Sequence, residues 1–344
     1  MANYPQLDDC SGVWTLKEVN DAVMGGYWRV AGSRGLFAGG NDGSGSDGSN
    51  IIDYVTIAST GNATDFGDLS AGAEFAGGFA SFTRMFALNG NSPYNRIDYV
   101  SIMTTGNSAD FGDATAGTFF RGGASNAIRG MFSGGDGSPD LNTIDYITMA
   151  HTGNAIDFGD LTVARRNHGN HSTSPTRACF TGGQTPSSQN VIDTVEIMTT
   201  GNAVDFGDLT AATGSVSSCS SSTRGVTAGG YTSADVDTAQ FITIASQGNA
   251  VNFGNLINDR HGAAACSNSV RGIWGGGRQN PGAGYGDFIE YLTINNGGTA
   301  LDFGDLTDGR NNLSAGSNAH GGLNDGYQGT RIHPIPQGGG AGQR

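Results

Sequence analysis

The chain has 344 residues and a formal net charge of −14, with 59 glycines, 8 prolines and only 14% charged residues. This acidic balance, with one pair of adjacent basic residues at 165–166, argues against a nucleic-acid-binding surface. No apolar run approaches the ~20 residues that a transmembrane helix needs, so we expect no membrane insertion.

Residues 1–30 differ from the rest of the chain and predict a short helix at 11–24. Leu16, Val19 and Val23 recur at helical spacing, and two glycines follow the segment and would end it. We therefore expect a helical N-terminal segment ahead of the main domain.

Three aromatic residues of this N-terminal segment, Trp14, Tyr27 and Trp28, are candidate partner contacts. Two interpretations stay open. The segment is either a docking element that binds another protein, or an element that closes one end of its own domain. The sequence favours neither.

A stretch that reads Asn-Ala-x-Asp-Phe-Gly-Asp-Leu in its clearest copies dominates the remaining sequence. It occurs six times, 45 to 50 residues apart, and its phenylalanines are Phe66, Phe111, Phe158, Phe206, Phe253 and Phe303. A fixed period of this size indicates a repeat architecture.

One repeat unit shows four short strand candidates. A polar stretch at 165–174 comes first, and a strand at 177–183 ends in two glycines. A strand at 191–197 alternates apolar and polar residues, as a half-buried strand does. A Thr-Gly-Asn turn leads to the last strand at 203–209. Four strands per unit at this period are typical of a β-propeller blade.

The double glycine recurs in the units at 39–40, 134–135, 182–183, 229–230 and 275–276, with Asn-Gly at 89–90. Together with the Ile-Asp-Tyr strand and the aromatic of the last strand, this pattern resembles the kelch repeat, although phenylalanine replaces the usual tryptophan. The resemblance implies an all-β fold: a six-bladed propeller over 31–326, followed by a glycine-rich extended tail at 327–344. Phenylalanines would pack between blades, and glycines on the inner strands would let the sheets crowd around the axis.

The ring must also close. The segment 312–318 resembles a first strand, whereas the N-terminal side begins with a second strand at 34–40. We predict that the C-terminal strand completes the first blade. In the competing arrangement, residues 27–32 supply that inner strand.

The loops between the second and third strands vary most in length, and loops on a rigid scaffold often carry recognition. They should leave from one face of the ring, at 41–50, 91–96, 136–142, 184–190, 231–238 and 278–286. Tyr94, Tyr231 and Tyr285 are the candidate contact residues there. The opposite face, with its tight Thr-Gly-Asn turns, should be a flatter docking surface.

Reactive groups give no catalytic pattern. Asp-Phe-Gly also occurs in protein kinases, but six copies without a phosphate loop predict a structural aspartate. His168 and His171 would face opposite sides of a strand, which predicts a polar inner strand instead of a metal site. Asp42 and Asp47 offer only two carboxylates, so calcium in that loop stays an open alternative.

The cysteines show no metal-ligand spacing and predict small core residues: Cys10, Cys179, Cys219 and Cys266. We therefore expect no cofactor, no metal and no enzyme activity. A polysaccharide hydrolase is the weakest alternative, because the units lack the Ser and Trp of sialidase-type boxes.

The degenerate repeat is also similar to kelch-like proteins of tailed bacteriophages, cyanophages especially, and residues 12–28 resemble a module of phage tail and fibre proteins. This resemblance implies a virion structural protein of a tail, fibre or nozzle. Its partners would be other virion proteins, bound through residues 1–30 and through 327–344, where Tyr327 is a further candidate contact. A host-surface glycan or receptor is the alternative partner.

Overall fold

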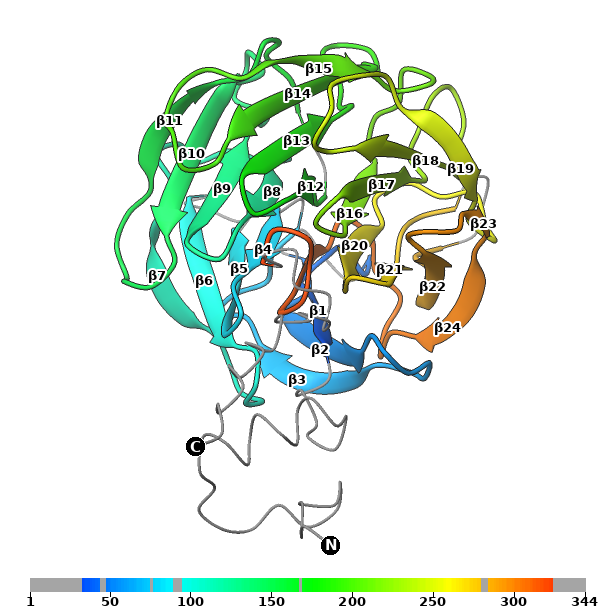
Figure 1. The fold of residues 1–344 in the computed structure, drawn as a ribbon. Helices are drawn as coiled ribbons and strands as arrows, with labels where there is room; N and C mark the ends of the chain where they lie inside the picture. The colour runs from blue at the N-terminus through cyan, green and yellow to red at the C-terminus, as the bar shows by residue number, and fades with distance from the viewer. Residues whose placement is uncertain are drawn as a thin grey trace, which may run out of the picture.

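The computed structural model describes residues 33–43, 48–74, 77–88, 95–166, 169–279 and 284–323. These residues form six β-sheets arranged as blades around a central axis, and no helix occurs among them (Figure 1). The expected all-β, six-bladed propeller is confirmed. The expected helix at 11–24 lies outside the described residues, as does the tail at 327–344.

Each blade is an antiparallel sheet whose strands run in order from the axis to the rim. The first blade is β25 (Ser314–Ser317), β1 (Arg34–Ala38), β2 (Ile51–Thr56) and β3 (Thr64–Asp68). The second is β4 (Gly78–Ala80), β5 (Arg84–Leu88), β6 (Arg96–Ser101) and β7 (Ala109–Asp113). The third is β8 (Gly122–Ser125), β9 (Arg129–Ser133), β10 (Thr143–Thr148) and β11 (Ile156–Asp160).

The other three blades repeat this order. The fourth is β12 (Ser172–Thr173), β13 (Arg177–Thr181), β14 (Val191–Glu196) and β15 (Val204–Asp208). The fifth is β16 (Ser217–Ser220), β17 (Arg224–Ala228), β18 (Thr238–Thr243) and β19 (Val251–Asn255), to which the short β23 (Gly298–Thr299) adds in parallel. The sixth is β20 (Ala264–Ser267), β21 (Arg271–Gly275), β22 (Phe288–Thr293) and β24 (Leu301–Asp305).

The C-terminal strand closes the ring. β25 pairs with β1 in antiparallel register, Leu36 opposite Gly316 and Phe37 opposite Ala315. This confirms the predicted closure. The competing arrangement is wrong, because β25 occupies the edge of β1 that residues 27–32 would have needed.

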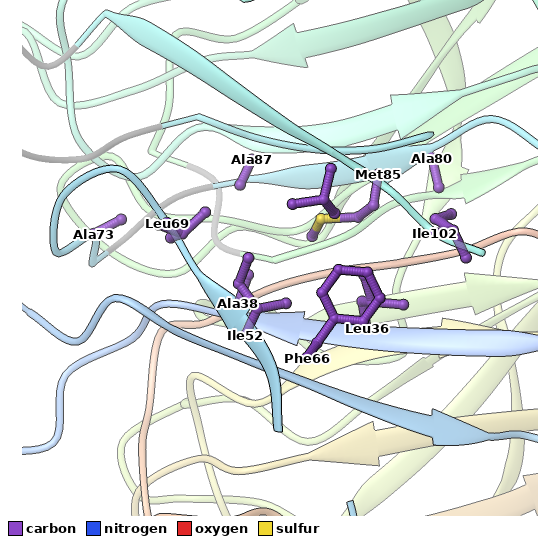
Figure 2. Packing of buried hydrophobic residues seen from close by; sticks show 11 residues of the cluster. Leu36, Ala38, Ile52, Phe66, Leu69, Ala73, Ala80, Met85, Ala87 and Ile102 are labelled. Atoms are coloured by element: carbon purple, nitrogen blue, oxygen red, sulfur yellow. The ribbon is translucent and has the colours of Figure 1, made fainter. Parts of the chain in front are cut away.

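The hydrophobic core lies between neighbouring blades. Phe66 of the first blade packs in one cluster with Leu36 and Ile52 of its own blade and with Met85 and Ile102 of the second (Figure 2). The repeat phenylalanine is buried in every blade, as predicted. Burying such a ring stabilises the fold by roughly 2–3 kcal/mol, and here it joins two blades.

The glycine after this phenylalanine has a backbone reason. At Gly67 φ is +142°, in the region that favours glycine, and a β-bulge interrupts the pairing of β2 with β3. A Cβ there would lie 2.6 Å from the carbonyl group of Gly106, in the Thr-Gly-Asn turn of the next blade. That turn is tied to β3 by its own bonds, since Asp68 N donates to Asn107 Oδ1 at 3.1 Å.

Glycine is required by close approach of neighbouring inner strands at only some positions around the axis. A Cβ at Gly123 would clash with the backbone of Gly78 in the inner strand of the neighbouring blade. The other inner strands fit with alanine and serine, for instance Ala264 and Ser267. The expectation of glycine on the inner strands therefore holds for part of the ring.

The two faces of the ring are built differently. The turn face carries the turns between first and second strands and between third and fourth strands, at 57–63, 81–83, 102–108, 126–128, 149–155, 174–176, 197–203, 221–223, 244–250, 268–270 and 294–300. The loop face carries the loops between second and third strands together with the linkers between blades. This arrangement is the predicted one.

Candidate functional site

The loop face is held together by short backbone bridges. In five blades the residue after the double glycine pairs with the linker that enters the same blade: Asn41 with Asn311, Asp136 with Phe119, Gln184 with Arg166, Tyr231 with Gly214 and Arg278 with His261. In the sixth unit the glycines with positive φ at this point are Gly276 and Gly277. The alignment of this unit on 275–276 was thus wrong by one residue.

Tyr231 is the predicted contact residue with the most polar surroundings. It is half-buried, and its ring meets the imidazole of His261 from the next blade edge to face, with centroids 5.9 Å apart. His261 Nδ1 lies 2.8 Å from Asp235 Oδ1, and Asp235 is buried. The three side chains form one group across the junction of the fifth and sixth blades.

At the junction between the third and fourth blades, an arginine and two acids make the corresponding contact. Arg166 of the fourth-blade linker contacts Asp136 at 3.2 Å and Asp140 at 3.4 Å, and both acids belong to the third-blade loop. His261 and Asp235 occupy the equivalent places. The bond between His261 and Asp235 therefore has a structural role, because it links adjacent blades.

The other predicted residues divide into two sets. Tyr285 lies half-buried in the sixth-blade loop, and a Cβ at Gly43 of the first blade would fall 2.6 Å from its ring. It therefore packs against a neighbour, as Tyr231 does. The remaining five lie outside the described residues: Trp14, Tyr27, Trp28, Tyr94 and Tyr327.

A small cavity lies on the axis, lined by residues of all six inner strands, by Asn170 and His171 ahead of β12, and by His320. Its volume of about 30 Å³ leaves room for one or two water molecules. On the loop-face side, Asn170 crosses the axis and donates from Nδ2 to the carbonyls of Gly78 and Ala315. On the turn-face side, the segment after β25 folds over the opening and places His320 Nε2 2.8 Å from Ala80 O.

Two histidines line this cavity and are neutral at physiological pH. Burial, with a smaller contribution from Arg165, lowers the pKa of His171 to about 3. Burial also lowers the pKa of His320 to about 4, although its bond to Ala80 acts in the opposite direction. The predicted polar inner strand is present as Ser172–Thr173, but His171 lies just ahead of it, and His168 lies outside the described residues.

The described cysteines are buried core residues, as predicted. Burial raises the pKa of Cys179 to about 12 and raises the pKa values of Cys219 and Cys266. These thiols stay protonated and unreactive. In the described ranges no three His, Cys, Asp or Glu side chains gather as metal ligands would.

A buried acid network in the third strands was missed by the sequence analysis, which expected half-buried strands. Asp53, Asp145 and Asp193 are fully buried, and each pairs with an arginine of the linker into its own blade. Arg165 Nη1, for example, lies 2.7 Å from Asp193 Oδ2. Glu290 and Arg260 form a looser pair at 3.6 Å, where burial lowers the pKa of Arg260 to about 10.

Hydroxyl groups complete this network. Thr162 Oγ1 donates to Asp193, and its backbone amide donates to the same carboxylate. Where the fifth blade has Gln240 in place of the acid, Thr210 makes the equivalent bonds to the amide oxygen. A signal existed in the sequence: an Asp, Glu or Gln stands 13 residues before each repeat phenylalanine.

Within the described part of the chain, no helix has the length and apolarity to cross a membrane. Comparison with models of known protein families finds no match, and a search of curated proteins finds no significantly similar sequence.

Proposed function

We propose that the protein is a non-enzymatic structural component of a tailed-bacteriophage virion, in which the propeller serves as an interaction scaffold in a tail, fibre or nozzle. The observation that carries this proposal is the distribution of exposed apolar side chains. Ten large apolar residues are exposed in the described ranges, and one of them, Ile257, lies on the loop face. The other nine lie on the turn face or at the start of an outer strand beside it: Phe82, Met103, Ile128, Ile156, Met198, Val204, Val251, Val270 and Leu301.

The turns themselves suit a protein contact. Phe82, Ile128 and Val270 occupy turns between first and second strands, and each is at least 50% exposed. None of the residues in the turn-face ranges carries a charged side chain. Charged groups border these turns: arginines such as Arg129 and Arg271 bond turn carbonyls of the next blade, and exposed acids such as Asp157 start the outer strands. Exposed apolar residues within a polar rim are typical of surfaces that other proteins cover.

Both ends of the described chain lie on this face. Ser33 accepts a bond from Ile57 at the start of a turn, and Leu323 follows the segment that covers the axis. Residues 1–30 and 327–344 therefore both connect to the ring at the turn face. This supports attachment to other virion proteins through these two segments and the turn face together.

The size of the axial cavity favours contact through surfaces. At about 30 Å³ it is far smaller than the roughly 300–1,000 Å³ of a pocket for a drug-sized ligand. A closed ring of sheets offers rigid faces, which suits a particle component that acts by shape.

Purified virions test the proposal directly. Mass spectrometry should detect the chain in particles, and cryo-electron microscopy should place the propeller with its turn face against a neighbour. A variant with Phe82→Ser, Ile128→Ser and Val270→Ser should fold normally but enter particles poorly, whereas Ile257→Ser on the loop face should not change incorporation. Particles that lack the polypeptide would refute the proposal.

A host-surface glycan receptor role is the second candidate, and the Tyr231 group on the loop face favours it. The Tyr231 ring offers a stacking surface to a sugar, and the partly exposed His261 beside it offers a polar edge, while the buried Asp235 holds this imidazole in place. A glycan array should then give hits that Tyr231→Ala abolishes and Tyr291→Phe, in the sixth-blade sheet, retains. An array without hits would count against this role.

A further inference from the structure

The turn between the third and fourth strands of the sixth blade departs from the other five. Those turns read Thr-Gly-Asn or Gln-Gly-Asn at their centre, whereas this one reads Asn-Asn-Gly-Gly-Thr at 295–299. The amide oxygen of Asn107 and of its four equivalents accepts a hydrogen bond from a backbone N–H of the preceding blade. In the sixth blade Thr299 takes this place, and Asn296 stands in front of a glycine instead.

The side chain of Asn296 is exposed to solvent and is not anchored. Among the described residues no hydrogen bond holds its amide group, in contrast to that of Asn107. The chain contains two Asn-Gly pairs, and the other one, at 89–90, lies outside the described residues. Asn296 is therefore the asparagine of the described ranges whose amide group water and its own backbone can both reach in front of a glycine.

The backbone nitrogen of Gly297 is suited to attack this amide group. Glycine has no Cβ that would hinder the approach of its nitrogen to Asn296 Cγ. The N–H donates to Thr293 O at 3.4 Å, which is long for a backbone hydrogen bond, so the nitrogen is held only weakly. Gly297 has a φ of +67°, and the other five turns have threonine or glutamine at this place.

We propose that Asn296 is a modification site, at which the chain deamidates without an enzyme. Hydroxide removes the proton from Gly297 N, and this nitrogen forms a bond to Asn296 Cγ. The Cγ–Nδ2 bond breaks and the amide nitrogen leaves as ammonia, which closes a five-membered succinimide ring. Water then adds to one of the two ring carbonyls and opens the ring, which gives aspartate or the β-linked isoaspartate. The reaction consumes one water, releases one ammonia and needs no oxidant or reductant.

Both products change the charge of the turn face. They place a carboxylate in a set of turns that carries no charged side chain in the unmodified chain. The carboxylate enters the turn that Arg224 binds from the fifth blade, with Nη1 3.0 Å from Ile294 O and 2.9 Å from Asn295 O. The reaction is independent of the proposed virion role, but it alters the face that this role would use.

Isoaspartate also changes the backbone, because it inserts one methylene group into the main chain ahead of Gly297. The turn has no room for this group at Gly297, where even a Cβ would lie 2.5 Å from Phe253 O of the fifth blade. The next two residues form β23, which pairs in parallel with β19, Gly298 opposite Gly254. The longer backbone should therefore displace β23 and weaken the junction of the fifth and sixth blades, whereas the aspartate product keeps the native backbone.

Incubation of the full folded chain at pH 8.5 and at pH 6, followed by trypsin digestion and mass spectrometry, tests the proposal. Cleavage after Arg278 and Arg310 gives one peptide that contains the turn. At pH 8.5 this peptide should gain about 1 Da, with the gain at Asn296, and isoaspartyl methyltransferase should label the same residue. The gain should be slower at pH 6, because less hydroxide is present to deprotonate Gly297 N.

Asn107, whose amide oxygen is bonded by Asp68 N, is the internal reference and should stay unmodified while Asn296 reacts. A native chain in which Asn296 stays intact, although the same residue reacts in urea, would overturn the proposal, and so would equal rates at Asn107 and Asn296. Asn296→Ser copies Ser59 and Ser246 at this place in the first and fifth blades and should abolish the gain without a change in melting temperature.

A second variant separates the charge from the backbone change. Asn296→Asp carries the new carboxylate on a native backbone and should melt as the unmodified chain does. The isoaspartate fraction, isolated by ion exchange from the incubated chain, should melt at a lower temperature. Equal melting temperatures of this fraction and Asn296→Asp would refute the effect on β23.

Discussion

Arg271 of the sixth blade donates from Nη1 to the carbonyl oxygen of Ile57 in the first blade, at 3.2 Å. The same nitrogen lies 3.0 Å from Ala58 O, and the guanidinium stacks over the Tyr291 ring. Every blade repeats this reach into the turn of the next: Arg34 to Ile102, Arg84 to Met149, Arg129 to Ile197, Arg177 to Ile244 and Arg224 to Ile294. The Arg271 bond joins the sixth blade to the first blade, in which β25 closes the ring, so it strengthens the junction beside the closure.

Replacing Arg271 should weaken this junction. Arg271→Met keeps much of the side-chain length but loses the two carbonyl bonds and the stacking on Tyr291, so the free energy of unfolding should fall by about 1–2 kcal/mol. Urea denaturation followed by circular dichroism measures the change. Arg278→Met, an exposed arginine of the loop face, is the matched control and should change stability by less than about 0.5 kcal/mol. Equal effects of the two variants would contradict the role assigned to Arg271.

Removal of the closing strand should be far more damaging. A chain that ends at residue 312 lacks β25, which exposes the inner edge of β1 and opens the axis. We expect loss of cooperative thermal unfolding or self-association by edge pairing, detected by calorimetry and size-exclusion chromatography. A chain that ends at Leu323 keeps β25 and His320 and is the control, with an expected melting temperature close to that of the full chain. Cooperative unfolding of both truncated chains would show that closure does not depend on β25.

The buried pair of Arg310 and Asp53 should behave as one unit. Arg310→Thr leaves a buried carboxylate without its partner and should cost about 3–5 kcal/mol. The fifth blade already shows an uncharged version, with Thr213 and Gln240 at the corresponding places. The double variant Arg310→Thr with Asp53→Gln copies it and should recover part of the loss, as a double-mutant cycle would reveal. Additive losses would refute the coupling.

The six-bladed fold could be predicted from the sequence because each sequence repeat corresponds to one blade. Phe66 and its equivalents mark blades, and the mismatch between a first strand at 312–318 and a second strand at 34–40 indicated how the ring closes. The polar network was harder to foresee. Alternation of apolar and polar residues predicted a half-buried third strand, whereas the polar Asp53 of such a strand is fully buried against a linker.

The linker partners explain this miss in physical terms. Arg165, Arg260 and Arg310 each stand seven residues after a repeat phenylalanine, but Arg121 stands ten after, and the fifth blade has no arginine there. Such pairing depends on how the linker folds back over the blade, which local propensity does not determine. Local propensity also does not predict the bond between His261 and Asp235, because the two residues belong to different blades.

Acid should destabilise the fold through the two axial histidines. In the unfolded chain a histidine has a pKa near 6.5, whereas burial lowers the pKa to about 4 for His320 and to about 3 for His171. Between pH 6.5 and pH 4 the unfolded state therefore binds more protons, and the free energy of unfolding falls as the pH falls. Each histidine contributes up to about 1.4 kcal/mol per pH unit in this window and nothing above it.

Comparison of variants separates this effect from the titration of carboxylates. His320→Gln should be less stable than wild type at pH 7.5, because it loses the bond to Ala80 O, but its stability should fall less steeply between pH 6.5 and pH 4.5. Urea denaturation across this range gives both slopes. His151→Gln, at an exposed position of a turn, should keep the wild-type slope. If His320→Gln retains the wild-type slope, His320 is not buried in its neutral form. The segment after β25 then covers the axial cavity less tightly than the hydrogen bonds of His320 indicate.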